Sequence, residues 1–230
     1  MIFNLTQPLF SSVPVLGKDF TWSGSDGTCL VIDDGGGNWR IKFLSSGVLT
    51  WLKDMLIDAF LVGAGGGGSL AGAGGGYTKT SRLITLLANT EYTITIGAGG
   101  TAGSQIAGGG TGGNTSAFEI TANGGRGGTS FLAGAHGGNG GSGGGNSGGT
   151  GGTDGSDGEK SSSSSGSAGK GQGTTTREFE ENTGTLYSSG GDGISDGAAA
   201  GADNTGDGGD CGKAGGSGIV VIRKHKEAAA

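Results

Sequence analysis

A glycine run is the first feature of this sequence whose residue types and spacing could support chemistry. Gly63–Gly68 follows an apolar stretch and satisfies the dinucleotide-binding pattern G-x-G-x-x-G. That pattern holds a pyrophosphate only where a helix begins next and an acidic residue follows about 20 residues later. Here the chain continues as SLAGAG, which does not start a stable helix, and no acid lies around Arg82–Ile84. We therefore expect no nucleotide cofactor.

Carboxylates and histidines form the other candidate groups. Gly152–Gly158 (GTDGSDG) resembles a calcium-binding glycine–aspartate repeat but lacks the aliphatic residue that packs such turns. Its two aspartates could hold a loose cation, although solvated acids that keep the surface soluble explain them better. His136 and His225 have no cysteine or carboxylate neighbour at metal-ligand spacing, so we expect surface side chains and no metal site.

Three glutamates, Glu178, Glu180 and Glu181, lie in an island of mostly non-glycine residues, 174–187. Paired carboxylates suit acid–base catalysis, but nothing nearby indicates a pocket that would shift their pKa values. No nucleophile–base pair is recognisable, so the sequence predicts no enzyme, no catalytic residue and no cofactor. The island interrupts the glycine repeat, so we expect a loop or hairpin at a tip. Its predicted partner-contact residues are Arg177, Phe179, Leu186 and Tyr187, and the alternative is that these side chains cap the end of a bundle.

The composition changes along the chain. Of its 60 glycines, 53 lie between Gly63 and Gly218. The net charge is −6, and acids predominate between residues 150 and 216, which repels nucleic acids and anionic membranes as partners. No apolar run reaches membrane-spanning length, and MIFNLTQPLF does not read as a signal peptide. Cys29 and Cys211 are expected to be free thiols.

A three-residue period organises the glycine-rich half. Positions 134, 137, 140, 143, 149, 152, 155 and 158 are all glycine, and only Asn146 interrupts the register. Three residues per turn is the repeat of the extended polyproline II helix, and bare α-carbons let such helices approach closely. Collagen would also need abundant proline, whereas this chain has two. We predict a bundle of polyglycine II helices. The alternative for 123–217 is a flexible, glycine-rich linker.

Strand-like runs precede, interrupt and follow the glycine tracts. Alternation at Trp39–Phe43 and Tyr92–Ile96 and apolar runs at Met55–Val62 and Ile219–Arg223 indicate strands. A further single strand is expected over Ser116–Thr121, after the second glycine tract. We expect an all-β fold: an antiparallel β-sandwich of the jelly-roll or tumour-necrosis-factor-like type, with the polyglycine II bundle inserted between strands and essentially no α-helix. Residues 1–22 are predicted to be an N-terminal arm or attachment segment, with a leading strand as the alternative. Residues 23–230 form one intertwined domain, with strands within 28–62, 77–122 and 218–224 and polyglycine II segments at 63–76, 97–113 and 124–217.

Several motifs resemble the glycine-rich tail and tail-fibre proteins of phages and prophages of gut Firmicutes. The similarity covers about residues 28–224. It is carried by DAFLVGAGGGG (58–68), GGGYTKT (74–80), YTITIGAGG (92–100), GQGTTTREF (171–179) and GGSGIVVIR (215–223). Similar modules occur in tail-fibre adhesins and beside the sandwich of anaplastic lymphoma kinase-type receptors. The aspartates within 191–214 depart from the nearly pure glycine of such tails, which either leaves open how the last helices pack or marks them as an outer layer of the bundle.

This resemblance implies a non-enzymatic virion component, located in the tail and outside the cell. It would display host-contacting loops on a rigid polyglycine II platform. Its implied partners are a glycan or protein receptor on the host surface, other tail subunits and further copies of itself, a trimer being one option; nucleic acid and membrane insertion are not expected. The alternative is a self-assembling structural subunit of an extracellular fibre. An ice-binding protein is a weaker reading, because the threonines at 101, 111, 129, 150 and 153 share no common phase.

Overall fold

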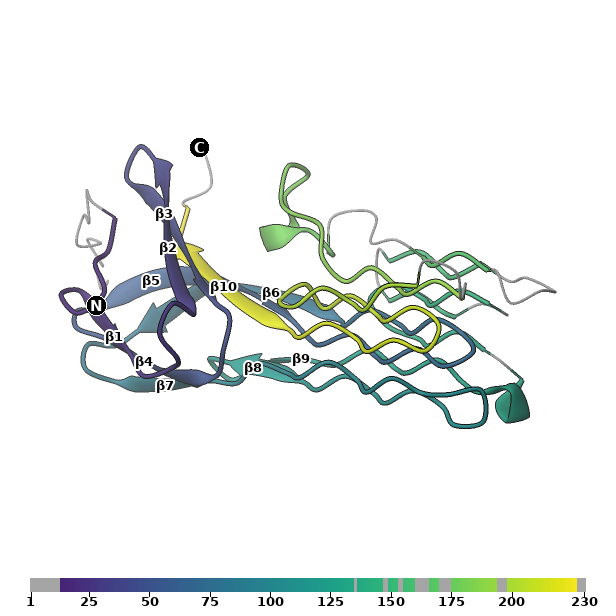
Figure 1. Cartoon of the computed structure of the whole chain (residues 1–230). Helices are drawn as coiled ribbons and strands as arrows, with labels where there is room; N and C mark the ends of the chain where they lie inside the picture. Colours follow the sequence, from purple (N-terminus) through teal and green to yellow (C-terminus); the bar gives the residue numbers. More distant parts are fainter. Residues whose placement is uncertain are drawn as a thin grey trace.

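The computed structural model describes residues 13–134, 136–146, 149–152, 155–159, 166–169, 175–193 and 198–226. It places a β-sandwich at one end and a bundle of long glycine-rich segments at the other (Figure 1). The all-β prediction is confirmed. In the described part of the chain the only helical elements are two 3-10 turns, η1 (Phe131–Ala133) and η2 (Glu178–Glu180). No helix there is long and apolar enough to cross a membrane.

The larger sheet contains five antiparallel strands in the order β2-β3-β10-β5-β6. The last strand of the chain, β10, lies in the middle, between β3 and β5. The glycine-rich half therefore leaves from β5 and returns as the central strand of the same sheet, which fixes both of its ends. The strands are β2 (Cys29–Gly35), β3 (Asn38–Phe43), β5 (Met55–Val62), β6 (Thr78–Leu86) and β10 (Ile219–Lys224).

The smaller sheet has the order β1-β4-β7, with β1 (Phe20–Trp22), β4 (Gly47–Trp51) and β7 (Glu91–Ile94). Residues 20–22, which the sequence analysis placed in the arm, thus pair with β4, as the leading-strand alternative has it. The single strand expected over Ser116–Thr121 is wrong. The chain forms a hairpin there, β8 (Thr115–Ala117) and β9 (Ile120–Ala122), because Phe118 and Glu119 adopt φ values of 52° and 62° and reverse its direction.

Alternation along the strands builds two apolar layers, one on each face of the larger sheet. Ala59 and Leu61 of β5 point between the two sheets, together with Val220 and Ile222 of β10. Trp51 closes this main core, with its ring stacked on Phe20 at 5.1 Å and on Trp39 at 5.6 Å. The intervening residues form a second cluster on the outer face, which consists of Phe60, Val62, Ile219 and Val221 with Phe179 and Tyr187. A sheet that is apolar on both faces needs a cover on the outer one.

Hydrogen bonds in the bundle repeat every three residues, as the polyglycine II helix requires. Successive N–H groups of Gly63–Gly68 donate to three different segments in turn, and its carbonyl groups accept from three more. This segment therefore has six neighbours and lies inside the bundle. Its N–H groups donate to three segments: to Gly113 and Gly110 from Ala64 and Gly67, to Gly216 and Lys213 from Gly65 and Gly68, and to Tyr77 and Gly74 from Gly63 and Gly66. Its carbonyl groups accept from three other segments, which supply the N–H groups of Gly100 and Gly103, of Gly125 and Gly128, and of Gly209.

The close approach of these segments explains the glycine content. A Cβ atom placed on Gly65 would lie 1.9 Å from the carbonyl oxygen of Asp207, and one on Gly67 would lie 1.9 Å from that of Thr101. No real Cβ contact is so short, so the neighbouring backbones would have to separate. Alanine also occurs in these segments, as at the fully buried Ala64 and Ala73.

Candidate functional site

Residues 175–187, here called the cover loop, pack on the outer face of the larger sheet. The rings of Phe179 and Tyr187 face Phe60 of β5, with centroid distances of 6.1 and 5.5 Å. Phe179 is 2% exposed and Tyr187 is 4% exposed. Burial of each large apolar side chain stabilises the fold by about 1.5–3 kcal/mol. The hydrophobic contact with Phe60 therefore holds the loop on the sheet.

Glu178 is the polar anchor of the cover loop and is itself only 2% exposed. Its carboxylate pairs with Arg40 Nη1 at 2.5 Å and with Lys42 Nζ at 3.2 Å, both from β3. The Tyr187 hydroxyl donates to Glu178 Oε2 at 3.0 Å. Burial, together with this neighbouring carboxylate, raises the pKa of Tyr187 well above its usual range, so the phenol stays a donor. Removal of either partner of such a buried pair leaves an uncompensated charge.

A second charged cluster lies at the end of β10. Arg223 Nε donates to the fully buried Asp58 at 3.0 Å, and its Nη1 pairs with Glu181 of the cover loop. The Arg223 guanidinium also lies over the Phe179 ring, 4.2 Å from its centroid. Burial opposes ionisation of Glu181, but the hydrogen bond to Arg223 and the charges of Arg223 and Lys226 outweigh it and lower the pKa of Glu181. This cluster ties the loop to β5 and β10 together.

His225 does not follow the expectation of a free surface side chain. Its Nδ1 lies 2.6 Å from Asp58 Oδ1, and the side chain is 12% exposed. The prediction failed because the partner lies 167 residues earlier in the chain, where no local spacing could show it.

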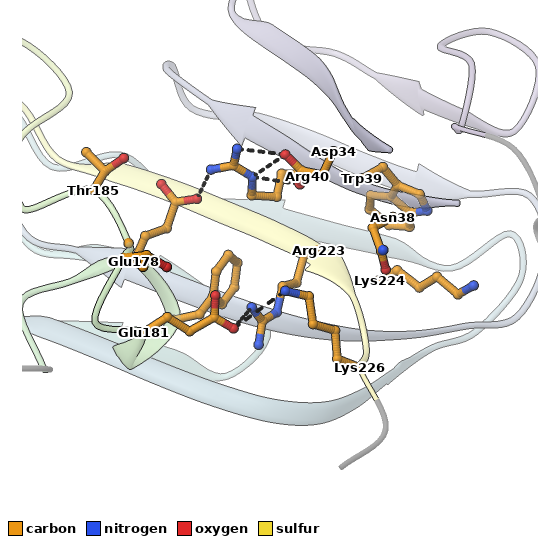
Figure 2. A pocket seen from close by; sticks show the side chains of 13 residues that line it. Asp34, Asn38, Trp39, Arg40, Glu178, Glu181, Thr185, Arg223, Lys224 and Lys226 are labelled. Carbon is orange, nitrogen blue, oxygen red and sulfur yellow. Dashed lines mark hydrogen bonds and ion pairs between the residues drawn. The ribbon is translucent and has the colours of Figure 1, made fainter. Parts of the chain in front are cut away.

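A cleft of about 340 Å³ lies between the cover loop and the adjoining ends of two strands, the beginning of β3 and the end of β10 (Figure 2). Its wall is charged on both sides. Arg40 lies between Asp34 and Glu178, while Arg223 faces Glu181, and Lys226 Nζ is 3.6 Å from the same carboxylate. The hydrogen bond from Arg40 lowers the pKa of Asp34, so this carboxylate stays ionised. The arrangement holds the cover loop in place and lines the cleft with polar groups. Among the described residues that line the cleft, no serine, threonine or cysteine is placed as a nucleophile against a base.

The four predicted contact residues lie together, but not as exposed side chains at a tip. Phe179 and Tyr187 are buried under the loop, and Leu186 is half-buried. Arg177 closes the loop from inside: its Nη1 donates to the Gly184 carbonyl at 3.0 Å, and its backbone bridges to Leu186. The expectation of exposure is corrected, because the apolar outer face of the sheet attracts these rings. Contact with a partner through this loop stays a prediction.

A family model described as a glycine-rich domain matches residues 44–225. The chain belongs to this glycine-rich domain family. A search among curated proteins finds no match to it. The matched range runs from the end of β3 through the bundle to the end of β10, so it covers most of the larger sheet and all the glycine-rich segments.

Among the described residues of the glycine-rich domain, the most exposed aliphatic side chains lie at its far end. Ile106 is 74% exposed and Leu132 is 79% exposed. They lie in two neighbouring chain reversals, 104–107 and 129–134, which we call the distal turns. The turns are held together at their bases, since Gly109 N donates to the Gly128 carbonyl at 2.9 Å. The hydroxyl of Ser69, which follows the central segment Gly63–Gly68, lies 2.6 Å from the Ser104 carbonyl oxygen and 2.8 Å from that of Ala107, so its single proton is shared between the two ends of the first turn.

The aspartates that depart from the pure-glycine pattern accept backbone N–H groups. Asp207 Oδ1 accepts from Ser189 N at 2.8 Å, and Asp210 accepts from Asp192 N and Ala199 N, each at 2.7 Å. These carboxylates replace the carbonyl groups that a further helix would supply, so they close the side of the bundle. Burial raises the pKa of Asp207. In the described part of the chain, no cluster of three or more histidine, cysteine or acidic residues is placed to hold a metal ion.

Three determinants of this site were not predicted from the sequence: Arg40, Asp58 and Arg223. A signal did exist for two of them, because Asp58 and Arg223 each interrupt or end an otherwise apolar strand. A charged residue in a buried strand needs a partner. The two are opposite each other in the pairing of β5 with β10, which only the register reveals.

Proposed function

We propose that this chain is a non-enzymatic component of a phage tail or tail fibre, in which the polyglycine II bundle supports turns that contact the host. The proposal rests on the difference between the interior of the bundle and its distal turns. Its interior leaves no room for a side chain at positions such as Gly67, where a Cβ atom would lie 1.9 Å from the Thr101 carbonyl oxygen, while its distal turns expose the aliphatic side chains of Ile106 and Leu132. We therefore expect apolar recognition on such a scaffold to take place at the turns.

The bundle suits display because it is held laterally by many hydrogen bonds. Each is worth about 0.5–1.5 kcal/mol net, and the central helix shares them with six neighbours. A turn at the end of such a rod keeps its position, so little ordering entropy is lost when it binds. Ile106 and Leu132 would then supply apolar contact area to a receptor on the host surface, either a protein or a glycan.

The resemblance to phage tail proteins supports a location in the virion tail, outside the cell. Other tail subunits and further copies of the chain are the additional partners that we propose. The exposed rim of the cover loop, at Thr183 and Thr185, offers a second contact surface on the sandwich.

The test is binding of the purified, fluorescently labelled chain to candidate host cells. The variant Ile106→Ser/Leu132→Ser removes apolar area from both distal turns without touching the bundle. We expect it to bind at least tenfold more weakly than the unaltered chain. Leu30→Ser, at a 42% exposed leucine on β2, is the matched control and should bind normally. Equal binding by the turn variant and the control would contradict the proposal.

A second candidate, a self-assembling structural fibre subunit, is favoured by the two outer strands of the larger sheet. Strands β2 and β6 end the strand order, so each has one edge without a strand partner among the described residues. Such edges can pair with another copy. Electron microscopy and light scattering separate the two functions: concentration-dependent filaments together with no binding to cells would favour the fibre subunit.

A further inference from the structure

A groove opens on the side of the sandwich, and none of the residues that line it belongs to the cover loop. Its volume is about 490 Å³, and it lies where β6 and β7 separate beside the β8–β9 hairpin. We call it the edge groove. At its floor the rings of Tyr92 and Phe118 lie 5.7 Å apart at 54°. The Tyr92 hydroxyl accepts the N–H of Leu87 at 2.7 Å, which fixes the ring. The lining residues are Ile84, Thr85, Glu91, Tyr92, Thr93, Phe118 and Glu119.

The turn that forms one wall of the groove is strained. Phe118 and Glu119 both have positive φ, 52° and 62°, in a two-residue hairpin turn where Asn-Gly is strongly preferred. For a residue with a bulky side chain this conformation is costly, and such outliers collect at binding sites. Here the strained backbone holds the Phe118 ring against Tyr92 and places the Glu119 carboxylate on the groove. A hairpin selected for stability alone would not use these two residues.

The charged side chains in the described lining of the groove are all negative. Glu91 and Glu119 are both exposed, and the described lining includes no lysine, arginine or histidine. Two carboxylates beside an aromatic pair are complementary to a cation, because the carboxylates attract it and the ring faces carry negative electrostatic potential. The planar guanidinium of arginine can bond a carboxylate and stack on a ring at the same time.

The backbone beside the groove offers an edge to an extended chain. β6 pairs with β5 on one side, and on the other a hydrogen bond from Tyr77 N to Asn123 O joins its beginning to the end of β9. Farther along, residues 84–86 have no strand partner on that second side within the described chain, and the bulge before them leaves Leu83 with a φ of 60° and its N–H donating to Asp58. Leu83 and Leu87 are 63% and 53% exposed on this edge. Exposed edges with apolar side chains are sites where a partner strand adds.

We propose that the edge groove binds an extended polypeptide segment of a partner protein, which lies along β6 and places an arginine side chain over Tyr92 and Phe118, between Glu91 and Glu119. This site does not include the distal turns. It shares β6 with the cover loop, which Arg82 bonds through the Phe179 carbonyl, but no cover-loop residue lines the groove. It does not depend on the proposed host-binding function, because a partner subunit or any other protein with such a segment would fit.

The test is an NMR titration of the isotope-labelled chain with the tripeptide Ac-Val-Arg-Val-NH2, up to millimolar concentration. We expect saturable shifts at the amides of Thr85, Tyr92 and Phe118. The same peptide with citrulline in place of arginine, which keeps the shape but removes the charge, should bind at least fivefold more weakly. Binding should also weaken as salt is raised, since both carboxylates are exposed.

Two variants separate recognition from folding. Glu91→Gln/Glu119→Gln should weaken binding about fivefold, while Asp26→Asn, a change of an exposed acid in another turn, should leave it unaltered. Glu119→Gly removes one carboxylate and relieves the strained φ, so it should bind more weakly and melt at the same or a higher temperature. Absence of saturable shifts, or equal binding of the citrulline peptide, would overturn the proposal, as would undiminished binding by the double variant.

Discussion

Substitution of Gly67 by alanine tests the packing of the bundle directly. The new Cβ atom would lie 1.9 Å from the Thr101 carbonyl oxygen, whereas ordinary contact begins near 3.4 Å. Thr101 and its segment must therefore retreat by about 1.5 Å (3.4 minus 1.9). Gly100 and Gly103, on either side, donate to Gly65 and Gly68 over 2.8 Å each. A shift of this size breaks both bonds, and each buried group left unpaired costs about 1–3 kcal/mol.

We therefore expect Gly67→Ala to lower the free energy of unfolding by about 3 kcal/mol, after the gain of about 0.4–1 kcal/mol that alanine brings by restricting the unfolded chain. For a chain of this length the melting temperature should fall by roughly 6–12 °C. Gly108→Ala is the matched control, because the nearest atom to its Cβ lies at 3.5 Å. It should be neutral or slightly stabilising. Circular dichroism melts of both variants decide the matter: equal melting temperatures would refute the close-packed bundle.

Three further predictions concern titratable groups. Glu178→Gln should destabilise the chain by about 2–4 kcal/mol, because Arg40 and Lys42 lose a buried counter-charge, and limited proteolysis should then cut the cover loop faster. The pKa of Asp207 is raised by burial, so its ionisation costs stability in full above the folded-state pKa, and this cost shrinks as the pH falls below that value and is gone below the pKa of the unfolded chain. Asp207→Asn should accordingly stabilise the chain at pH 7 and not at strongly acidic pH, as measured by urea unfolding at both. Burial raises the pKa of Cys29 from 9.0 to about 11, so iodoacetamide at pH 8 should alkylate it about a hundredfold more slowly in the folded chain than in urea, followed by mass spectrometry.

Most strands of the sandwich could be predicted from the sequence because alternation is a local signal. Met55–Val62 and Ile219–Lys224 form β5 and β10 close to their expected bounds. The three-residue glycine register likewise reports a local repeat, and the hydrogen bonds of Gly63–Gly68 follow the same period. The hairpin at Phe118 was missed because its turn carries none of the residues that usually signal one.

The position of the cover loop could not be predicted, because its contacts span most of the chain. Glu178 pairs with Arg40 across 138 residues, and Arg223 with Asp58 across 165. Composition suggested an exposed island at a tip, whereas the apolar outer face of β5 and β10 draws the aromatic rings inward. The second apolar layer was visible in the continuous run Phe60–Val62, since a strand buried on both faces does not alternate.

The six-neighbour lattice also governs how such a rod can change length. One turn of the helix takes three residues and rises about 9 Å. An insertion of one or two residues in Gly63–Gly68 would rotate every later donor towards the wrong neighbour, and an insertion of three would project beyond the segments around it. Elongation must therefore come in matched triplets across adjacent helices at once. The distal turns that contain Ile106 and Leu132 are not bound by this three-residue rule. Over evolution we therefore expect the length of the bundle to be kept while the sequences of its distal turns change freely.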